Sequence, residues 1–343
     1  MITETPLFLL ARDRRGRAPE PALSSPSAPT GPAHERSAGT TLARVIRRHR
    51  DRRGLRGRNA IGAGALLASL PMLTLPAPAR SEVRQSSFTS PYLGREVGYV
   101  VDLPPSYEQS SRRYPVVYVL HGLFERPGFW ERRGLAPIFA RLRASGAVPQ
   151  LVVVAVDGGN SFFVNGPGGR YEDLVTRDLV AHVESAYRVV PGRAGRALLG
   201  VSMGGYAALR IAFEHPELAV AVATHSAMLL ERIPSAAQGA GQWHMAAFHA
   251  AFGDPIDPEL WRESDPLVWA GRVDPKAVPA LYFDCGAEDR YGLAAGHRAL
   301  DRILGEHGVS HSFELPPGDH GYEFVRARIE TSLRFLGERL RGE

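Results

Sequence analysis

Hydrophobic and polar positions alternate in two ways along the chain from about residue 85 onward. Short runs rich in Val, Leu and aromatic residues predict β-strands, and between them apolar residues recur at the spacing of amphipathic helices. Several runs are apolar at every position, which is typical of a sheet buried on both faces. The predicted strands span residues 95–104, 115–122, 150–158, 196–202, 219–226, 279–286 and 310–316. The predicted helices span residues 171–188, 204–216, 294–308 and 323–340.

This order of elements predicts an α/β fold with a mainly parallel central sheet flanked by helices on both faces. The chain has 343 residues, of which 44% are hydrophobic, and this suits a sizeable core. Region 227–278, with three of the four Trp and many Pro and Gly, breaks the rhythm and is expected to be an insertion above the sheet. We therefore expect a folded domain over residues 80–343.

Residues 1–79 have the composition of a leader rather than of a fold. Residues 11–58 are rich in Arg, Pro, Ser and Gly without apolar periodicity, so we expect them to be disordered. The segment Ala60–Leu75 has no charged residue, follows a basic run and precedes the small residues Ala77-Pro78-Ala79. This is the pattern of a secretory signal, and it is short for a membrane-spanning helix. It predicts export to the periplasm or the extracellular space, with no stable membrane insertion after cleavage.

Two alternatives stay open for this leader. The pair Arg52-Arg53, followed by Gly54 and Leu55, resembles a twin-arginine export signal, although Arg56 stands where an apolar residue is usual. The signal-like segment begins late in the chain, which indicates either a long basic region or a start codon assigned too far upstream. An uncleaved membrane anchor is the other interpretation.

The net charge of +5 does not indicate a nucleic-acid partner, because it is concentrated in the leader. Residues 1–79 hold 13 Arg and 5 acidic residues, and the other 28 basic and 31 acidic residues leave the remainder at −3. The body therefore lacks the clustered basic surface of a nucleic-acid binder. The chain has one cysteine, Cys285, so an internal disulfide and a cysteine-based metal site are excluded.

The stretch GVSMGG, residues 200–205, carries the first candidate chemistry. Ser202 lies between a predicted strand and a predicted helix, with Gly200 and Gly204 two residues away on either side. A nucleophile elbow needs small residues at those positions, because its serine sits on a strained turn. The plain alternative is a serine that caps a helix. The strand before it and the helix after it favour the elbow.

A nucleophilic serine needs a histidine base held by a carboxylate, and in α/β-hydrolases the acid and then the histidine follow the serine in the chain. His320, in PPGDHGYEF, occupies the loop after the last predicted strand. Asp289, in CGAEDRY, is the preferred acid. Glu288 and Asp265 are alternatives, while Asp284 falls within a strand.

The oxyanion requires two backbone N–H donors. Met203, directly after the serine, supplies one, and Leu123, in the loop after strand 115–122, supplies the other, with His121 orienting that loop. No metal or organic cofactor is implied. The single Cys285 is expected to be a buried structural thiol. The aromatic candidates for substrate binding are Trp130, Phe162, Phe163 and Trp243.

These segments together resemble the esterase D-like group of α/β-hydrolases. The resemblance runs from about Tyr92 to Leu340. Its marks are YPVVYVLHG, VDGGNSFFVN, RALLGVSMGGYAALRIAFEHPELAVAVATHSA, LYFDCGAED and GDHGYEF. The group includes S-formylglutathione hydrolases, feruloyl and acetyl-xylan esterases, enterochelin esterases and mycolyltransferases. Its nucleophile, acid and histidine map onto Ser202, Asp289 and His320.

The resemblance implies an α/β-hydrolase fold and an exported serine esterase that acts on a small-molecule or polysaccharide-linked ester through an acyl-enzyme on Ser202. The alternatives are an acyltransferase of the mycolyltransferase type and a thioesterase similar to S-formylglutathione hydrolase. A catalytically inactive module of the same fold is a third hypothesis, which the intact serine, acid and histidine disfavour.

Overall fold

The structure, a computed structural model, describes residues 82–235 and 242–341. The leader with its signal-like segment and twin arginines lies outside these residues. The strands are β1 (Glu82–Ser90), β2 (Arg95–Leu103), β3 (Val116–Leu120), β4 (Val152–Val156), β5 (Asn165–Gly166), β6 (Gly169–Arg170), β7 (Arg196–Val201), β8 (Ala221–His225), β9 (Ala280–Asp284) and β10 (His311–Glu314).

The part of the chain that the structure describes has ten α-helical segments and two short segments of other pitch. The α-helices are α1 (Phe129–Arg132), α2 (Leu135–Ala144), α3 (Tyr171–Asp173), α4 (Val180–Ala186), α5 (Met203–Glu214), α6 (Gln242–Phe252), α7 (Pro258–Ser264), α8 (Pro266–Ala270), α9 (Ala294–Glu306) and α10 (Tyr322–Arg339). A π-helical segment, Leu174–Leu179, joins α3 to α4, and a 3₁₀ turn spans Arg193–Gly195.

Eight strands form one sheet in the order β1-β2-β4-β3-β7-β8-β9-β10. β2 is antiparallel to both β1 and β4, and every other neighbouring pair is parallel. This is the α/β-hydrolase fold that the sequence predicts. Parallel strands end at the same edge of a sheet, so the loops after β3, β7, β8, β9 and β10 meet at one edge, where ligands of open α/β sheets bind.

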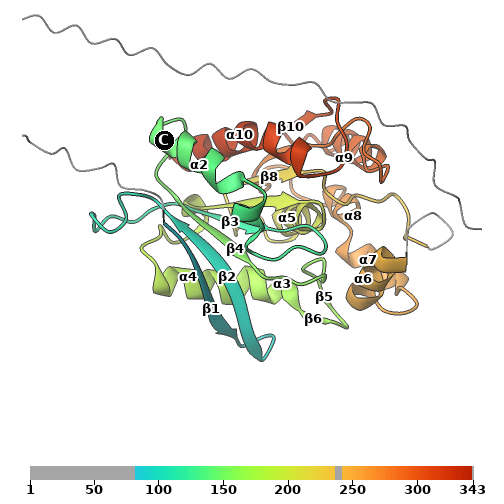
Figure 1. The fold of residues 1–343 in the computed structure, drawn as a ribbon. Coiled ribbons are helices and arrows are strands. Elements are labelled where there is room, and N and C mark those ends of the chain that lie inside the picture. Colours follow the sequence, from blue (N-terminus) through green and yellow to red (C-terminus); the bar gives the residue numbers. More distant parts are fainter. Residues whose placement is uncertain (1–81, 236–241, 342–343) are drawn as a thin grey trace, which may run out of the picture. The chain divides into compact units, whose positions relative to one another are not determined.

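Helices cover both faces of this sheet (Figure 1). On β3, Val116, Tyr118 and Leu120 belong to one hydrophobic core, and Val117 and Val119 belong to the other. α5 and α9 pack in the first core, and α2 and α10 pack in the second. Because both faces are buried, a run such as VVYVL has no polar position.

The seven predicted strands are confirmed, each shorter than predicted by one to four residues in total. The predicted helix over 171–188 is the run from α3 through the π-helical segment to α4. The sequence pattern missed β1, because EVRQSSFTS is polar and largely exposed at the sheet edge. It also missed α1, α2 and the hairpin of β5 and β6. The expected insertion at 227–278 contains α6, α7 and α8 within its described part.

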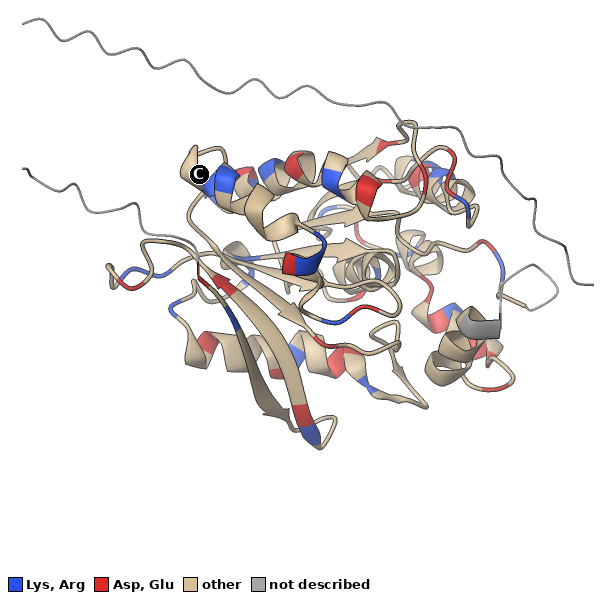
Figure 2. Ribbon diagram, viewed as in Figure 1, with Lys and Arg blue, Asp and Glu red and all other residues tan. Residues whose placement is uncertain are grey.

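Acidic and basic side chains are interspersed along the helices of the described part (Figure 2). Among residues 82–235 and 242–341, no helix has the length and apolar character needed to cross a bilayer.

Candidate active site

Ser202 sits on a strained turn between β7 and α5. Its backbone has φ 54° and ψ −114°, a region that a residue with a Cβ rarely adopts. The Ser202 N–H donates to the His225 carbonyl at 3.0 Å, and the Ser202 carbonyl accepts from Tyr206 N and Met228 N, each at 3.0 Å. Residues at and after the end of β8 therefore hold the turn on one side, and α5 holds it on the other.

The two glycines of the motif allow this turn to close. A Cβ on Gly200 would lie 2.2 Å from the Gly204 carbonyl oxygen, and a Cβ on Gly204 would lie 2.0 Å from the Leu120 carbonyl oxygen. Any side chain at either position would collide with backbone. The motif is thus used as an elbow here, and the helix-cap alternative is excluded because the Ser202 side chain makes no capping hydrogen bond.

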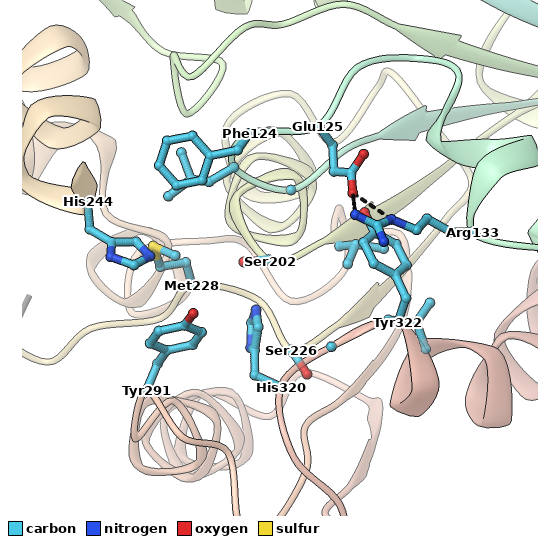
Figure 3. A pocket seen from close by; sticks show the side chains of 15 residues that line it. Phe124, Glu125, Arg133, Ser202, Ser226, Met228, His244, Tyr291, His320 and Tyr322 are labelled. Carbon is cyan, nitrogen blue, oxygen red and sulfur yellow. Dashed lines mark hydrogen bonds and ion pairs between the residues drawn. The ribbon is translucent and has the colours of Figure 1, made fainter. Parts of the chain in front are cut away.

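His320 and Asp289 form a hydrogen-bonded pair beside this serine. His320 Nδ1 lies 2.8 Å from Asp289 Oδ2, and since a carboxylate only accepts, the Nδ1–H donates. Burial raises the pKa of the Asp289 carboxyl, but the hydrogen bond and charge of His320 outweigh this and hold the pKa below its usual value. Asp289 is therefore ionised at neutral pH, which fixes the tautomer that leaves His320 Nε2 free to accept a proton. Figure 3 shows the imidazole pointing toward Ser202.

Cys285 also contacts the acid. Its thiol lies 3.5 Å from Asp289 Oδ2 and is fully buried. Burial and the adjacent carboxylate raise the pKa of the thiol, so it stays protonated and donates to Asp289. This is the buried thiol that the sequence led us to expect, placed against the acid.

The other acids weighed from the sequence have different partners. Glu288 accepts from Gly318 N at 2.6 Å and is largely exposed. Asp265 caps α8 by accepting from Leu267 N at 2.8 Å. Asp284 is fully buried within β9. The structure therefore brings Asp289, and not these three residues, to His320.

The start of α5 and the loop after β3 both lie beside Ser202. The first hydrogen bond of α5 runs from Tyr206 N to Ser202, so the N–H of Met203 is one of the free donors at the start of the helix. The residues Gly122 and Leu123 line the pocket that contains Ser202. A Cβ on Gly122 would lie 3.4 Å from the Ser202 Cβ, so the loop after β3 runs directly against the nucleophile.

His121 holds this loop in place. The ring is fully buried, with Nδ1 2.8 Å from the Gly122 carbonyl oxygen and Nε2 accepting from Gly158 N at 3.1 Å. Burial lowers the pKa of His121, so the ring is neutral, with Nδ1 as donor. The structure therefore gives His121 the orienting position that the sequence led us to expect.

A pocket of about 200 Å³ opens over Ser202. Figure 3 shows two unlike sides: Phe124, Met228, His244 and Tyr291 lie on one side of the serine, and Glu125, Arg133 and Tyr322 lie on the other. Of these, Phe124 is 53% exposed and Tyr291 48% exposed, which is unusual for aromatic side chains. The lining residues are Gly122, Leu123, Phe124, Glu125, Arg133, Val201, Ser202, Ser226, Met228, His244, Tyr291, His320, Gly321, Tyr322 and Val325.

Three of the aromatic residues expected to bind substrate lie in the core instead. Trp130 is fully buried, and its Nε1 donates to Asp102 Oδ2 at 3.0 Å. Phe162 is fully buried against Phe248, at 4.8 Å between ring centroids, and Phe163 is fully buried against His121, at 5.6 Å. None of the three lines the pocket, so the expectation is corrected: they support the loops around it.

Trp243 lies in α6, but its side chain is outside the described residues. Its neighbour His244 lines the pocket, with ring centroids 5.9 Å from Phe124 and 5.4 Å from Tyr291. The sequence analysis missed Phe124, His244, Tyr291, Arg133 and Tyr322. Four of them lie within ten residues of Leu123, Asp289 or His320, and this closeness was the available signal.

A second Ser–His–Asp set lies elsewhere in the fold. His225 Nδ1 is 2.8 Å from Asp284 Oδ1, and His225 Nε2 is 2.8 Å from Ser332 Oγ. All three residues are fully buried, and Asp284 also accepts from Tyr282 and Arg328. This set links β8 and β9 to α10 and has no access to the pocket.

One cluster among the described residues has the side chains of a metal site. Glu172, Glu214 and His215 place ligand atoms within 4.8 Å of one another. Arg210 Nη1 lies in the same cluster, 2.8 Å from Glu172 and 2.6 Å from Glu214. The guanidinium neutralises the carboxylates, so we read the cluster as an ion-pair network.

The fold and the arrangement around Ser202 define an α/β-hydrolase with the site of a serine hydrolase. The chain belongs to the Esterase family, described as "Putative esterase", whose model matches residues 90–336. It is 26% identical over 269 residues to a protein named esterase Rv1288 from Mycobacterium tuberculosis, with 71% of this chain and 56% of that protein covered. The chain thus spans about half the length of that relative.

Two further relatives show the same relationship over more of their length. The chain is 26% identical over 266 residues to S-formylglutathione hydrolase of Paracoccus denitrificans, covering 72% of this chain and 90% of that protein. Among solved structures, a ferulic acid esterase superposes with a TM-score of 0.64 at 26% identity, covering 76% of this chain and 99% of the other.

Proposed function

We propose that this protein is a serine esterase that cleaves carboxylic esters through an acyl-enzyme on Ser202. The observation that carries the proposal is the strained Ser202 in one pocket with His320, whose tautomer is fixed by Asp289, and with the loop of Leu123. Met203, the next residue after Ser202, begins α5. Family membership supports it independently.

The residues take the following roles. His320 Nε2 accepts the proton of the Ser202 hydroxyl as Oγ attacks the ester carbonyl carbon, and the carbonyl oxygen gains the negative charge. The amides of Leu123 and Met203 donate hydrogen bonds to that oxyanion. The intermediate expels the alcohol, to which His320 returns the proton. Water, deprotonated by His320, then releases the acid, and Asp289 stabilises the imidazolium at each step.

The aromatic side of the pocket suits an apolar or aromatic part of the ester. Phe124, His244 and Tyr291 come from three separate segments and offer exposed ring surface at the pocket mouth. Such surface gains free energy when a substrate group covers it. We accordingly propose aryl and feruloyl-type esters as the first substrates to examine, in line with the named activity of the ferulic acid esterase.

Burst kinetics test the proposal directly. Rapid mixing of the protein with 4-nitrophenyl butyrate should release a burst of 4-nitrophenol equal to the enzyme concentration, if deacylation is slow, and Ser202→Ala should remove both burst and turnover. Added alcohols measure how the acyl-enzyme divides between water and an acceptor. If most of the acyl group goes to the alcohol at low alcohol concentration, the activity is acyl transfer and not hydrolysis. Full turnover by Ser202→Ala would refute the proposal.

We propose also that the protein is exported, on the sequence pattern of residues 52–79. Expression of the full chain followed by N-terminal sequencing of the extracytoplasmic fraction should find a mature start near Arg80. Replacement of Arg52 and Arg53 by lysine should trap the chain inside if the twin-arginine route is used. Full-length protein confined to the cytoplasm contradicts export.

A further inference from the structure

The side of the pocket opposite the aromatic residues carries an arginine. Glu125, Arg133 and Tyr322 lie there, and Figure 3 shows them on the far side of Ser202 from Phe124, His244 and Tyr291. An arginine in a substrate pocket is costly to desolvate unless it has a partner, so its surroundings indicate what the pocket binds.

The ion pairs on this side leave a surplus of positive charge. Glu125 is buried and is shared by two guanidinium groups: Oε2 lies 2.7 Å from Arg132 Nη2, and Oε1 accepts from Arg133 Nε at 2.7 Å. A third guanidinium, that of Arg326, donates to the Arg133 carbonyl oxygen at 3.4 Å. One carboxylate therefore faces two cations at hydrogen-bond distance.

The Arg133 guanidinium is held in a fixed position. Glu125 Oε1 takes its Nε and Nη2, at 2.7 and 2.5 Å, and its Cζ lies 4.7 Å from the centroid of the Tyr322 ring. Within the described residues Nη1 donates no hydrogen bond, and the side chain keeps 47% of its surface exposed. A guanidinium oriented before binding loses less entropy when it binds a carboxylate.

The Tyr322 side chain supports this placement. Its hydroxyl is buried and has no hydrogen-bond partner among the described residues. Burial and the nearby Glu125 raise its pKa, so the ring stays neutral and offers its face to Arg133. Arg133, which lines the pocket, is thus fixed by a carboxylate on one side and an aromatic face on the other.

From this arrangement we propose that Arg133 binds a carboxylate on the substrate, so that the preferred esters carry an anionic group a few bonds from the ester carbonyl. The inference rests on the proposed esterase activity and names the class of ester. The pocket of about 200 Å³ contains both Ser202 and Arg133, so a short spacer suffices. Arg133 is a specificity-determining residue in this view, while the chemistry stays with Ser202 and His320.

Matched ester pairs test the inference. On the acyl side, 4-nitrophenyl hydrogen glutarate is compared with 4-nitrophenyl pentanoate, and on the alcohol side, 4-(butanoyloxy)benzoate is compared with its methyl ester. The readout is the ratio of kcat/KM for the charged ester to kcat/KM for the neutral one. In Arg133→Gln the ratio should fall by about tenfold or more in one pair, since a charge-assisted hydrogen bond is lost. Arg133→Lys should lose less, and the pair that responds identifies the side that carries the anion.

Arg132→Gln is the matched control, because Arg132 pairs with the same Glu125 but does not line the pocket. Its charged-to-neutral ratio should stay within about twofold of the wild type. Unchanged ratios in Arg133→Gln for both pairs, or equal falls in Arg132→Gln and Arg133→Gln, would overturn the inference. The esterase proposal is tested separately. If the wild type cleaves the neutral esters and Ser202→Ala does not, the esterase proposal holds even where the inference about Arg133 fails.

Discussion

The molecule contains two Ser–His–Asp sets that share a similar His–Asp hydrogen bond and have opposite surroundings. His320 lies 2.8 Å from Asp289, and His225 lies 2.8 Å from Asp284. Ser202 occupies a strained turn at a pocket, whereas Ser332 lies within α10 and is fully buried. The first set opens to a pocket, and the second is enclosed by protein.

The difference shows that three residue types at hydrogen-bond distance do not make an active site. Ser202 has Met203 N–H and the loop of Leu123 beside it, where an oxyanion can be stabilised. Ser332 Oγ instead lies 3.0 Å from the Ile329 carbonyl oxygen in its own helix. A pocket open to solvent, a strained backbone and nearby amides distinguish the Ser202 set from the Ser332 set, although both contain the same three residue types.

The buried set still serves the site through backbone. The His225 carbonyl accepts the N–H of Ser202, and the Asp284 carbonyl accepts the N–H of Ser226 at 2.7 Å. Both serines have positive φ at the ends of adjacent strands. The buried hydrogen bonds that hold His225 and Asp284 therefore also hold the backbone to which Ser202 and Ser226 are bonded.

The largest expected effect separates the two serines. Ser202→Ala should lower kcat/KM for 4-nitrophenyl butyrate by about 10⁴-fold or more, because the nucleophile is removed. Ser332→Ala should leave kcat/KM within about threefold of the wild type. Steady-state kinetics on both variants, with circular dichroism to confirm folding, measure the contrast. Comparable losses in the two variants contradict it.

The next largest expected effect is the difference in kcat between variants of Asp289 and of Glu288. Asp289→Asn should lower kcat by about 10³ to 10⁴-fold, because the amide no longer fixes the tautomer of His320. The variant should unfold at a denaturant concentration close to that of the wild type. Glu288→Asn is the control, since the Glu288 carboxylate accepts from Gly318 N and not from His320, and it should retain activity. A larger loss of kcat for Glu288→Asn than for Asp289→Asn would show that Glu288 is the catalytic acid.

The third contrast concerns stability. His225→Ala should lower the free energy of unfolding by about 3 kcal/mol, because it leaves a cavity and removes hydrogen bonds from the fully buried Asp284 and Ser332. His320→Ala should cost about 1 kcal/mol or less, because that side chain lies at the pocket. Urea unfolding of both variants measures the difference, and an equal or reversed order contradicts the division into structural and catalytic sets.

The smallest effect is on acid stability. Burial raises the pKa of Asp284, but His225, Tyr282 and Arg328 outweigh this, so its folded pKa lies below the ordinary 3.8. Its contribution to stability is therefore fully present above pH 4 and is lost as the pH falls through the lowered folded pKa. Asp284→Asn should lose less stability than the wild type between pH 4 and pH 2. A parallel pH dependence in the two proteins contradicts the ionised pair.

Much of this site could be predicted from the sequence because its chemistry follows strand ends. Ser202 comes directly after a strand, Asp289 and His320 lie in the loops after two later strands, and parallel strands bring such loops to one edge. The order of serine, acid and histidine along the chain then suggests the role of each residue. The structure adds the hydrogen bond between His320 and Asp289.

The pocket walls could not be predicted in the same way. Trp130 is buried because Asp102 of β2, 28 residues earlier, accepts its Nε1–H, and Phe162 is buried because α6 covers it. Phe124 and Tyr291 are exposed because nothing in the described chain covers them. Whether an aromatic residue lies in a core or at a pocket depends on contacts between distant segments, which periodicity does not record.

Mapping of a covalent adduct tests the central claim most directly. The wild-type protein is treated with a fluorophosphonate, digested and analysed by mass spectrometry, with Ser202→Ala and Ser332→Ala treated in parallel. One adduct per chain should appear, on the peptide that contains Ser202, and it should be absent only from Ser202→Ala. An adduct on the Ser332 peptide, or undiminished labelling of Ser202→Ala, would contradict the assignment of the open set as the catalytic one.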